Sequence, residues 1–228
     1  MLISLCIPCG NRLPDLRQAM PHIVRAANAS PPVQIAVLDY NSSDGLDQLI
    51  EHTPVTPLAN GNVLTCSKYI GRSHFHKAHA FNLAMLAGIG EYCVLMPADG
   101  CPAMGYVQAL RQLIAEGCVW MCSAELCGIV CCRRQEFIAA GGYDERFEFY
   151  GPEDRDLHLR LQRRGGKFCL VPPGLLCVIP TPDNDKVRNY RLLLSKREMS
   201  RRMRPILDEN TAAGTLTANA GQEWGRWT

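Results

Sequence analysis

Residues 2–7 read LISLCI and residues 33–39 read VQIAVLD, and both apolar runs end in polar turns. The first run stops at Pro8 and Gly10, and the second gives way to Asn-Ser-Ser-Asp-Gly at 41–45. Short apolar runs bounded by turn residues are typical of buried strands. The residues between the two runs repeat apolar side chains at helical spacing, so the chain opens as strand, helix, strand.

The same alternation continues to about residue 180. Strands that alternate with helices imply a largely parallel sheet with helices on both faces. In such folds the functional residues follow the carboxyl ends of the strands. Further strands are expected at 63–66, 92–97, 118–123, 127–132, 167–171 and 175–179, and helices at 13–28, 77–88, 103–116, 133–142 and 152–165.

A chain of 228 residues suits one domain with a short appendage. We expect residues 1–180 to form a single α/β domain, with a mostly parallel central sheet flanked by helices. Residues 181–206 would form a basic C-terminal helix, helical over 187–204, packed on or beside that domain. Residues 207–228 are small and polar without periodicity, which predicts a mobile tail.

Composition excludes several classes of protein. Apolar residues make up 47% and charged residues 20% of the chain, which excludes collagen-like, coiled-coil and wholly disordered chains. The formal net charge of +2 excludes an overall nucleic-acid-coating charge. No apolar run approaches the roughly 20 residues that span a bilayer, and the first run is too short for a signal peptide. We therefore expect a cytoplasmic protein, bacterial or in the host cytoplasm if phage-encoded.

The chain has twelve cysteines, most of them inside apolar runs, where cysteine behaves as a small hydrophobe. Cys6 and Cys9 have the spacing of a metal or redox pair, and Cys127, Cys131 and Cys132 offer further thiolates. Because Cys6 and Cys9 straddle a strand end and no second paired motif follows, we do not expect a zinc site.

Polar motifs occupy the expected strand ends. They are Pro-Cys-Gly-Asn-Arg at 8–12, Asp39 with the turn that follows it, Pro-Ala-Asp-Gly at 97–100, and Tyr-Gly-Pro-Glu-Asp-Arg-Asp at 150–156. In this order and on this frame they resemble the GT-A fold nucleotide-sugar glycosyltransferases. The resemblance covers residues 2–180 and implies a GT-A, Rossmann-like, mostly parallel sheet in a single domain.

Two subgroups of these enzymes contribute to the resemblance. The stretch ending in LDYNSSDG looks like the large inverting family that includes cellulose and chondroitin synthases. IPCGNR, FHKAHAFNLA and GGYDERFEFYGPEDRDLHLRL resemble the β-1,4-galactosyltransferases, whose motifs include IPFRNR, FNRAKLLNVG and WGGEDDD. The resemblance implies an inverting transfer of a hexose from a UDP-sugar to an acceptor hydroxyl.

A donor site follows from the resemblance. Pro8 would line the nucleobase slot, Arg12 would reach the nucleotide, and Asp39 would accept a hydrogen bond from the uracil imide. Phe75 would pack beside the uridine, and Lys77 stands where the family has an arginine that contacts the diphosphate. A lysine neutralises phosphate as a point charge. Without the family match, Asp39 would be a turn acid and Lys77 a surface lysine.

The resemblance also implies a divalent metal, Mn²⁺ or Mg²⁺, on the diphosphate. Asp99 stands at the second acid of the family's D-x-D motif, and Pro97 replaces the first acid. The family's later Met and His are missing from LLCVIPTPDNDK, where Asp183 and Asp185 are the candidates to replace them. If they do not, metal binding is weak, or it is absent and Lys77 and Arg12 carry the charge.

Three histidines, His74, His76 and His79, crowd the segment around Phe75. Such spacing occurs at metal sites. The family match accounts for the segment without a metal, so we expect no histidine site.

The resemblance places the acceptor chemistry on one helix. Asp154 would be the general base, which takes the proton of an acceptor hydroxyl as the oxygen attacks the anomeric carbon from the far face. Glu153 and Tyr150 would contact the acceptor, with Tyr150 in place of a family tryptophan. Pro152 replaces a glycine and Arg155 replaces an acid, which indicates an unusual acceptor. Without the family match, these acids would merely suit a helix N-terminus.

Residues 186–204 carry eight basic side chains against one acid, either as a solvated helix face or as a docking surface for a polyanion. The expected acceptor is therefore a glycan, with a hydroxylated DNA base as the other class.

Other enzymes on a similar frame are retaining transferases and nucleotidyltransferases. The alternative from another class is a catalytically degenerate module that binds sugar or nucleic acid, which Pro97 favours and the intact Glu153 and Asp154 oppose.

Overall fold

The computed structural model describes residues 1–46, 48 and 55–227. The helices are α1 (Leu13–Ala29), α3 (Lys77–Ala87), α4 (Tyr106–Ala115), α5 (Arg134–Ala139), α6 (Glu153–Arg163), α7 (Asp183–Val187) and α8 (Lys196–Ala212), with a short 3-10 turn η1 (Ala59–Gly61). The strands are β1 (Ile3–Cys9), β2 (Val33–Tyr40), β3 (Val55–Pro57), β4 (Val63–Tyr69), β5 (Tyr92–Leu95), β6 (Gly100–Pro102), β7 (Trp120–Ser123), β8 (Val130–Arg133), β9 (Phe168–Val171) and β10 (Leu176–Val178).

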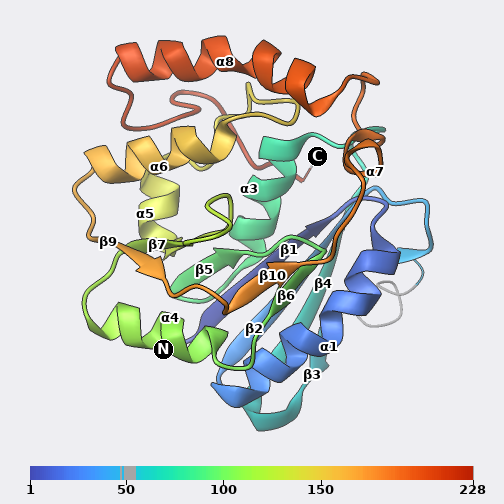
Figure 1. The fold of residues 1–228 in the computed structure, drawn as a ribbon, viewed down its shortest axis with the longest axis vertical. Coiled ribbons are helices and arrows are strands. Elements are labelled where there is room, and N and C mark those ends of the chain that lie inside the picture. Colours follow the sequence, from blue (N-terminus) through green and yellow to red (C-terminus); the bar gives the residue numbers. More distant parts are fainter. Residues whose placement is uncertain (47, 49–54, 228) are drawn as a thin grey trace.

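One large sheet forms the centre of the molecule, in the strand order β3-β4-β2-β1-β5-β8-β7-β9 (Figure 1). The strands β4, β2, β1 and β5 run parallel to one another, β3 is antiparallel to β4, and β8 is antiparallel to both β5 and β7. The strands β6 and β10 pair as a separate antiparallel ribbon. The predicted α/β fold, a mostly parallel central sheet flanked by helices in a single domain, is confirmed.

Helices cover both faces of the sheet. The helices α1 and α4 pack on one face, α3, α5 and α6 on the other, and α8 lies outside α6 (Figure 1). Every residue of β1 is buried, because its alternate side chains enter the two cores in turn. Cys9 belongs to the core under α1, whereas Cys6 belongs to the core under α3. The two thiols therefore point to opposite faces of the sheet and do not form a zinc pair.

The basic C-terminal segment differs from the prediction of one helix over 187–204. The structure has the two helices α7 and α8, with residues 188–195 between them. Ser195 and Glu198 form a capping box, in which each side chain accepts the other residue's backbone N–H. This cap begins α8, which then continues to Ala212.

Residues 213–227 run back across α5 and α3. The Asn219 side chain donates a hydrogen bond to the Gly141 carbonyl at 2.8 Å, and the rings of Trp224 and Phe137 lie 6.1 Å apart. Whether this tail moves in solution stays a prediction.

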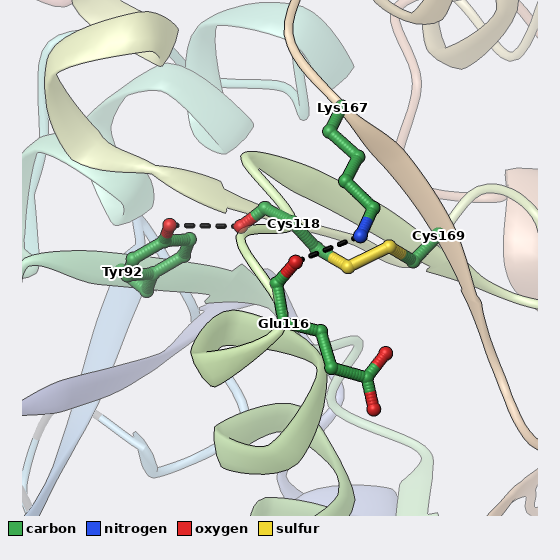
Figure 2. Close-up of a disulfide and its surroundings, with 5 residues drawn as sticks. All are labelled: Tyr92, Glu116, Cys118, Lys167 and Cys169. Carbon is green, nitrogen blue, oxygen red and sulfur yellow. Dashed lines mark hydrogen bonds between the residues drawn. A yellow bond between two sulfur atoms is a disulfide. The ribbon is translucent and has the colours of Figure 1, made fainter.

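A disulfide joins Cys118, after α4, to Cys169 in β9 (Figure 2). Nearby, Lys167 donates to the Glu116 carbonyl at 2.7 Å, and the Tyr92 hydroxyl donates to the Cys118 carbonyl at 2.8 Å. Local patterns predict that most of the cysteines are small apolar side chains, because the pairing of β7 with β9 is not visible in them. Disulfides are rare in a reducing cytoplasm, so the expected cytoplasmic location stays a prediction.

Among the helices of the described residues, none combines the length and the apolar character that a membrane span needs.

A buried polar network ties α6 to α8. The Arg160 side chain is fully buried, and its Nε donates to Asp156 at 2.9 Å. Asn210 of α8 donates to the carboxylates of Asp156 and Asp144 at 2.8 and 2.9 Å. The network fixes α6, the helix that begins with Glu153 and Asp154.

We predict that Asp156→Ala lowers the free energy of unfolding by about 3–5 kcal/mol, because it leaves the Arg160 charge buried without its carboxylate. Asp208→Ala is the matched control, since its ion pair with Arg204 is exposed and such pairs contribute about 0–1 kcal/mol. Urea denaturation of both variants measures the difference. Equal stability of the two variants would contradict the structural role of the network.

Candidate active site

A hollow of about 350 Å³ opens beyond the carboxyl ends of β1 and β5. Its walls come from segments far apart in the sequence: the loop after β1, the start of α3, the loop after β5, the start of α6 and the segment around α7. The predicted site residues that line it are Pro8, Arg12, Phe75, Lys77, Asp99, Tyr150, Glu153 and Asp154.

A second hollow, of about 370 Å³, adjoins the first and shares Gly10, Phe75, Asn189 and Tyr190 with it. Its remaining lining residues are Asn11, Tyr40, Asn41, Arg72, Ser73, His74, Arg188 and Arg191. Among the described residues, no acidic side chain lines this second hollow. The two hollows therefore lie on either side of a shared wall, and arginines line the second one.

Two asparagines in left-handed conformations fix the loops of the site. Asn11 has a φ of 53° and Asn41 a φ of 52°, a region that asparagine tolerates. The Asn11 side chain accepts the backbone N–H of Ser43 at 2.7 Å, and Asn41 donates to the Arg72 carbonyl at 2.7 Å. These bonds connect the segments that follow β1, β2 and β4.

Phe75 lies on the backbone of the first loop. A Cβ atom on Gly10 would stand 2.7 Å from Phe75 Cδ2, so the ring requires a glycine there. The Phe75 N–H donates to the Asn189 carbonyl at 2.8 Å, and the Tyr190 ring packs edge-on at 5.8 Å. Phe75 thus lines both hollows and is fixed in place by these contacts.

Asp39 does not line either hollow. It is fully buried at the end of β2, and its Oδ1 accepts the backbone N–H of Ser42 at 2.8 Å. The structure gives Asp39 a role in shaping the turn, and its expected contact with a uracil stays a prediction.

Lys77 and Glu153 form a buried ion pair, with Nζ and Oε1 2.5 Å apart. The Glu153 side chain is 1% exposed, and Lys77 also lies over the Tyr150 ring at 4.1 Å. Burial opposes the charge on Lys77, but the Glu153 carboxylate prevails and raises the pKa of Lys77 above its ordinary value. The pair links the N-terminus of α3 to that of α6, so Lys77 is held by the protein's own carboxylate.

Asp154 follows Glu153 in the first turn of α6 and lines the first hollow. Its Oδ1 accepts the backbone N–H of Arg155 at 2.7 Å. A Cβ atom on Gly128 would stand 3.0 Å from its Oδ2, so the loop before β8 closes tightly on this carboxylate. A half-buried carboxylate in this position can accept a proton from a group bound in the hollow.

Positive side chains occupy the surroundings of Asp99. Arg12 Nη2 lies 3.1 Å from Asp99 Oδ2, and Lys186 Nζ lies 4.0 Å from the same atom. Two unit charges about 4 Å apart interact by about 4 kcal/mol at an effective dielectric of 20. These cations therefore oppose a divalent ion beside Asp99.

The residues present do not offer a ligand set for a divalent metal. Neither Asp183 nor Asp185 lines the hollow, and Pro97 has no ligand atom in its side chain. Within the described part of the chain, no group of three or more His, Cys, Asp or Glu side chains is arranged to hold a metal ion. Mn²⁺ and Mg²⁺ can complete their coordination with diphosphate oxygens and water, but Asp99, the one expected ligand on the hollow, is already paired with two cations, so the residues present fit these ions poorly.

Two of the three histidines serve the fold, and His74 lines the second hollow. His76 caps α3 by accepting the backbone N–H of His79. His79 uses both ring nitrogens, one with the Tyr40 hydroxyl at 2.8 Å and one with the Arg226 carbonyl at 3.1 Å. Burial lowers the pKa of His76 to about 3.

Sequence reasoning missed several lining residues of the site: Asn11, Lys186, Asn189, Tyr190 and Lys196. Lys186 and Lys196 stand out in the sequence only as members of a basic run. Their place on the hollow depends on the path of residues 183–196, which no local pattern predicts.

We predict that Lys77→Met destabilises the protein by about 3–5 kcal/mol at pH 7, because Glu153 loses its counter-charge. Burial raises the pKa of Glu153 and the Lys77 charge lowers it, so without Lys77 folding favours the protonated carboxyl. A carboxyl whose pKa rises on folding stabilises the protein at low pH and loses that contribution as the pH increases.

The loss of unfolding free energy in Lys77→Met should therefore become smaller as the pH falls from 7 toward about 4.5, the ordinary pKa of a glutamate. Urea denaturation at several pH values measures it, and Lys77→Arg, which keeps the charge, is the control. A loss of unfolding free energy that does not change with pH would contradict the ion pair.

Comparisons with known proteins agree with this geometry. Residues 117–179 match the family model described as the N-terminal domain of galactosyltransferase. A comparison with curated proteins gives no match.

Solved structures share the fold at low identity. The mannosyltransferase PcManGT from Pyrobaculum calidifontis, in complex with GDP-Man and Mn²⁺, is 20% identical with a TM-score of 0.61, over 79% of this chain and 57% of that one. Staphylococcus aureus TarS 1–349 in complex with UDP-GlcNAc is 13% identical with a TM-score of 0.68, over 97% and 68%. A mutant Drosophila β-1,4-galactosyltransferase 7, in complex with manganese, UDP-Gal and xylobiose, is 14% identical with a TM-score of 0.58, over 87% and 79%.

The chain spans less than two thirds of the length of the mannosyltransferase that it matches. Two of these structures contain manganese, one of the two metals that the sequence resemblance implies. The motifs, the matched region and the fold agree: this chain has the GT-A fold of the nucleotide-sugar glycosyltransferases, and its residues 117–179 are similar to a galactosyltransferase domain.

Proposed function

We propose that this protein is an inverting glycosyltransferase that moves a hexose from a UDP-sugar to an acceptor hydroxyl. The observation that carries the proposal is the convergence of the predicted donor and acceptor residues on one hollow, with Asp154 on its wall. Nucleotide-sugar complexes of the similar structures support the same class of donor.

The donor would lie across the two hollows. Phe75 offers a ring to the uracil, and Pro8 lies on the same side of the first hollow. The diphosphate then meets the basic residues near Asp99, and the hexose faces Asp154. Binding in this way holds the anomeric carbon and the general base Asp154 in one geometry. Such positioning supplies a large part of the catalysis of a transfer reaction.

In the reaction, the acceptor hydroxyl lies between Asp154 and the anomeric carbon. The Asp154 carboxylate takes the hydroxyl proton as the acceptor oxygen forms its bond to the anomeric carbon. The bond from that carbon to the diphosphate breaks on the opposite face, and UDP leaves with the electron pair. Attack from the far face inverts the stereochemistry. Basic side chains neutralise the charge that develops on the leaving diphosphate.

A glycan is the acceptor class that the comparisons favour, because one of the similar structures is a complex with xylobiose. Tyr150 and Glu153 lie on the first hollow beside Asp154. An aromatic face such as that of Tyr150 packs well against a sugar ring. No comparison supports a DNA base as the acceptor.

We predict that Asp154→Asn reduces the release of UDP from a UDP-hexose at least about 100-fold, since a positioned general base contributes about 10²–10⁴-fold. UDP binding should stay within about twofold of the unchanged protein, because the amide keeps the size of the carboxylate. Release of UDP from a panel of UDP-hexoses measures turnover, and calorimetry measures binding.

Asp208→Asn, on the exposed side of α8, is the control and should retain full turnover. Full turnover by Asp154→Asn would contradict the assignment of the base. Binding of UDP-sugars without any turnover by the unchanged protein would favour the degenerate binding module instead.

A further inference from the structure

We propose that this chain binds the donor diphosphate without a divalent metal, through Arg12 and Lys186, which converge on Asp99. The inference rests on the proposed function and says how the same site recognises its substrate. A diphosphate needs positive charge around its oxygens, and either a metal ion or basic side chains can supply it.

The first observation is the environment of the Asp99 carboxylate. Arg12 Nη2 stands 3.1 Å and Lys186 Nζ 4.0 Å from its Oδ2. Arg12 is further fixed by Asp15, 2.5 Å from its Nε, and by the Thr181 hydroxyl at 3.2 Å. A guanidinium held from three sides is ready to bind an anion at little further entropic cost.

The second observation is the path of α7. Asp183 is 70% exposed and pairs with Lys196 at 2.5 Å, and Asp185 pairs with Arg188 at 3.6 Å. Both carboxylates, the sequence's candidates for metal ligands, are therefore absent from the lining of either hollow and are engaged by cations that do line them. The same short helix instead brings Lys186 to the hollow, so α7 supplies a cation where metal ligands were expected.

The third observation is the charge of the second hollow. Beyond Lys186, the chain adds Arg188 and Arg191 to the lining of that hollow, which also includes Arg72. None of the described residues that line that hollow is acidic. A diphosphate bound at Arg12 and Lys186 would therefore lie beside a hollow whose charged lining residues are arginines.

Asp99 then has a different role from that of a metal ligand. Its carboxylate holds Arg12 and Lys186 near each other, which like charges would otherwise resist. In this arrangement Asp99 balances the charge of the two cations in the free protein, and its negative charge opposes the diphosphate itself.

The experiment is isothermal titration calorimetry of the full chain with UDP, once with EDTA and once with Mn²⁺. We expect the two dissociation constants to agree within about twofold. Binding in Mn²⁺ that disappears in EDTA would overturn the metal-free site and leave the proposed function intact. Absence of UDP binding in both conditions would overturn the donor class, and the inference with it.

Variants make the test specific to the two cations. Lys186→Met should weaken UDP binding in EDTA about tenfold or more. Lys167→Met removes an exposed lysine that bonds to the Glu116 carbonyl outside both hollows (Figure 2), and it should leave binding unchanged. Equal binding by the two variants would overturn the role of Lys186.

Asp99→Asn distinguishes the two roles of Asp99 by the direction of its effect. A metal ligand loses its charge in this variant, so UDP binding in Mn²⁺ would fall. In the metal-free site a repulsive charge disappears while Asp15 still holds Arg12, so UDP binding in EDTA should stay equal or become tighter. A tenfold loss of UDP binding in Asp99→Asn, with an unchanged thermal midpoint of the free protein, would overturn the proposal.

Discussion

The buried ion pair between Lys77 and Glu153 is the contact on which the site depends. It joins the first residue of α3 to the first residue of α6, and both helices begin at the hollow. Glu153 is 1% exposed, so the loss of either partner would leave the other as a buried charge without a counter-charge. Asp154 follows Glu153 in the chain, and Tyr150 lies against Lys77, so the pair positions the acceptor side of the site as a unit.

The central sheet supplies the other side of the site. The parallel strands β1, β2 and β4 end at one edge, and asparagine side chains connect the loops that follow them. The second connection comes from residues 188–195, since Asn189 accepts the Phe75 N–H and donates to the Gly10 carbonyl at 3.1 Å. A rigid frame and a returning C-terminal segment thus enclose the two hollows, which suits a ligand with a flat base at one end and a sugar at the other.

Local patterns predicted the frame well. The strands β1, β2 and β5 are continuous apolar runs with turn residues at their ends, and the acids and arginines at the two ends of α6 match its dipole. The motifs at the strand ends then predicted which side chains meet in the first hollow, with the exception of Asp39. Asp39 lies one residue before the end of β2, where its side chain is needed by the turn.

Contacts between distant segments were not predictable in the same way. The disulfide between Cys118 and Cys169 depends on the register of β7 with β9. The role of Lys186 depends on the short helix α7 and on the capping box of Ser195 and Glu198, which divides the basic run into two helices. Charge counting detected this run but not its path, and the path determines which of its side chains face the substrate.

The central claim is that the paired hollows bind a nucleotide sugar. The most direct measurement is the thermal midpoint of the protein against a panel of nucleotides and nucleotide sugars, because a ligand that binds only the folded state must raise it. The account predicts that UDP and at least one UDP-hexose raise the midpoint, and that adenine nucleotides do not. A midpoint that no nucleotide or nucleotide sugar changes would contradict the account.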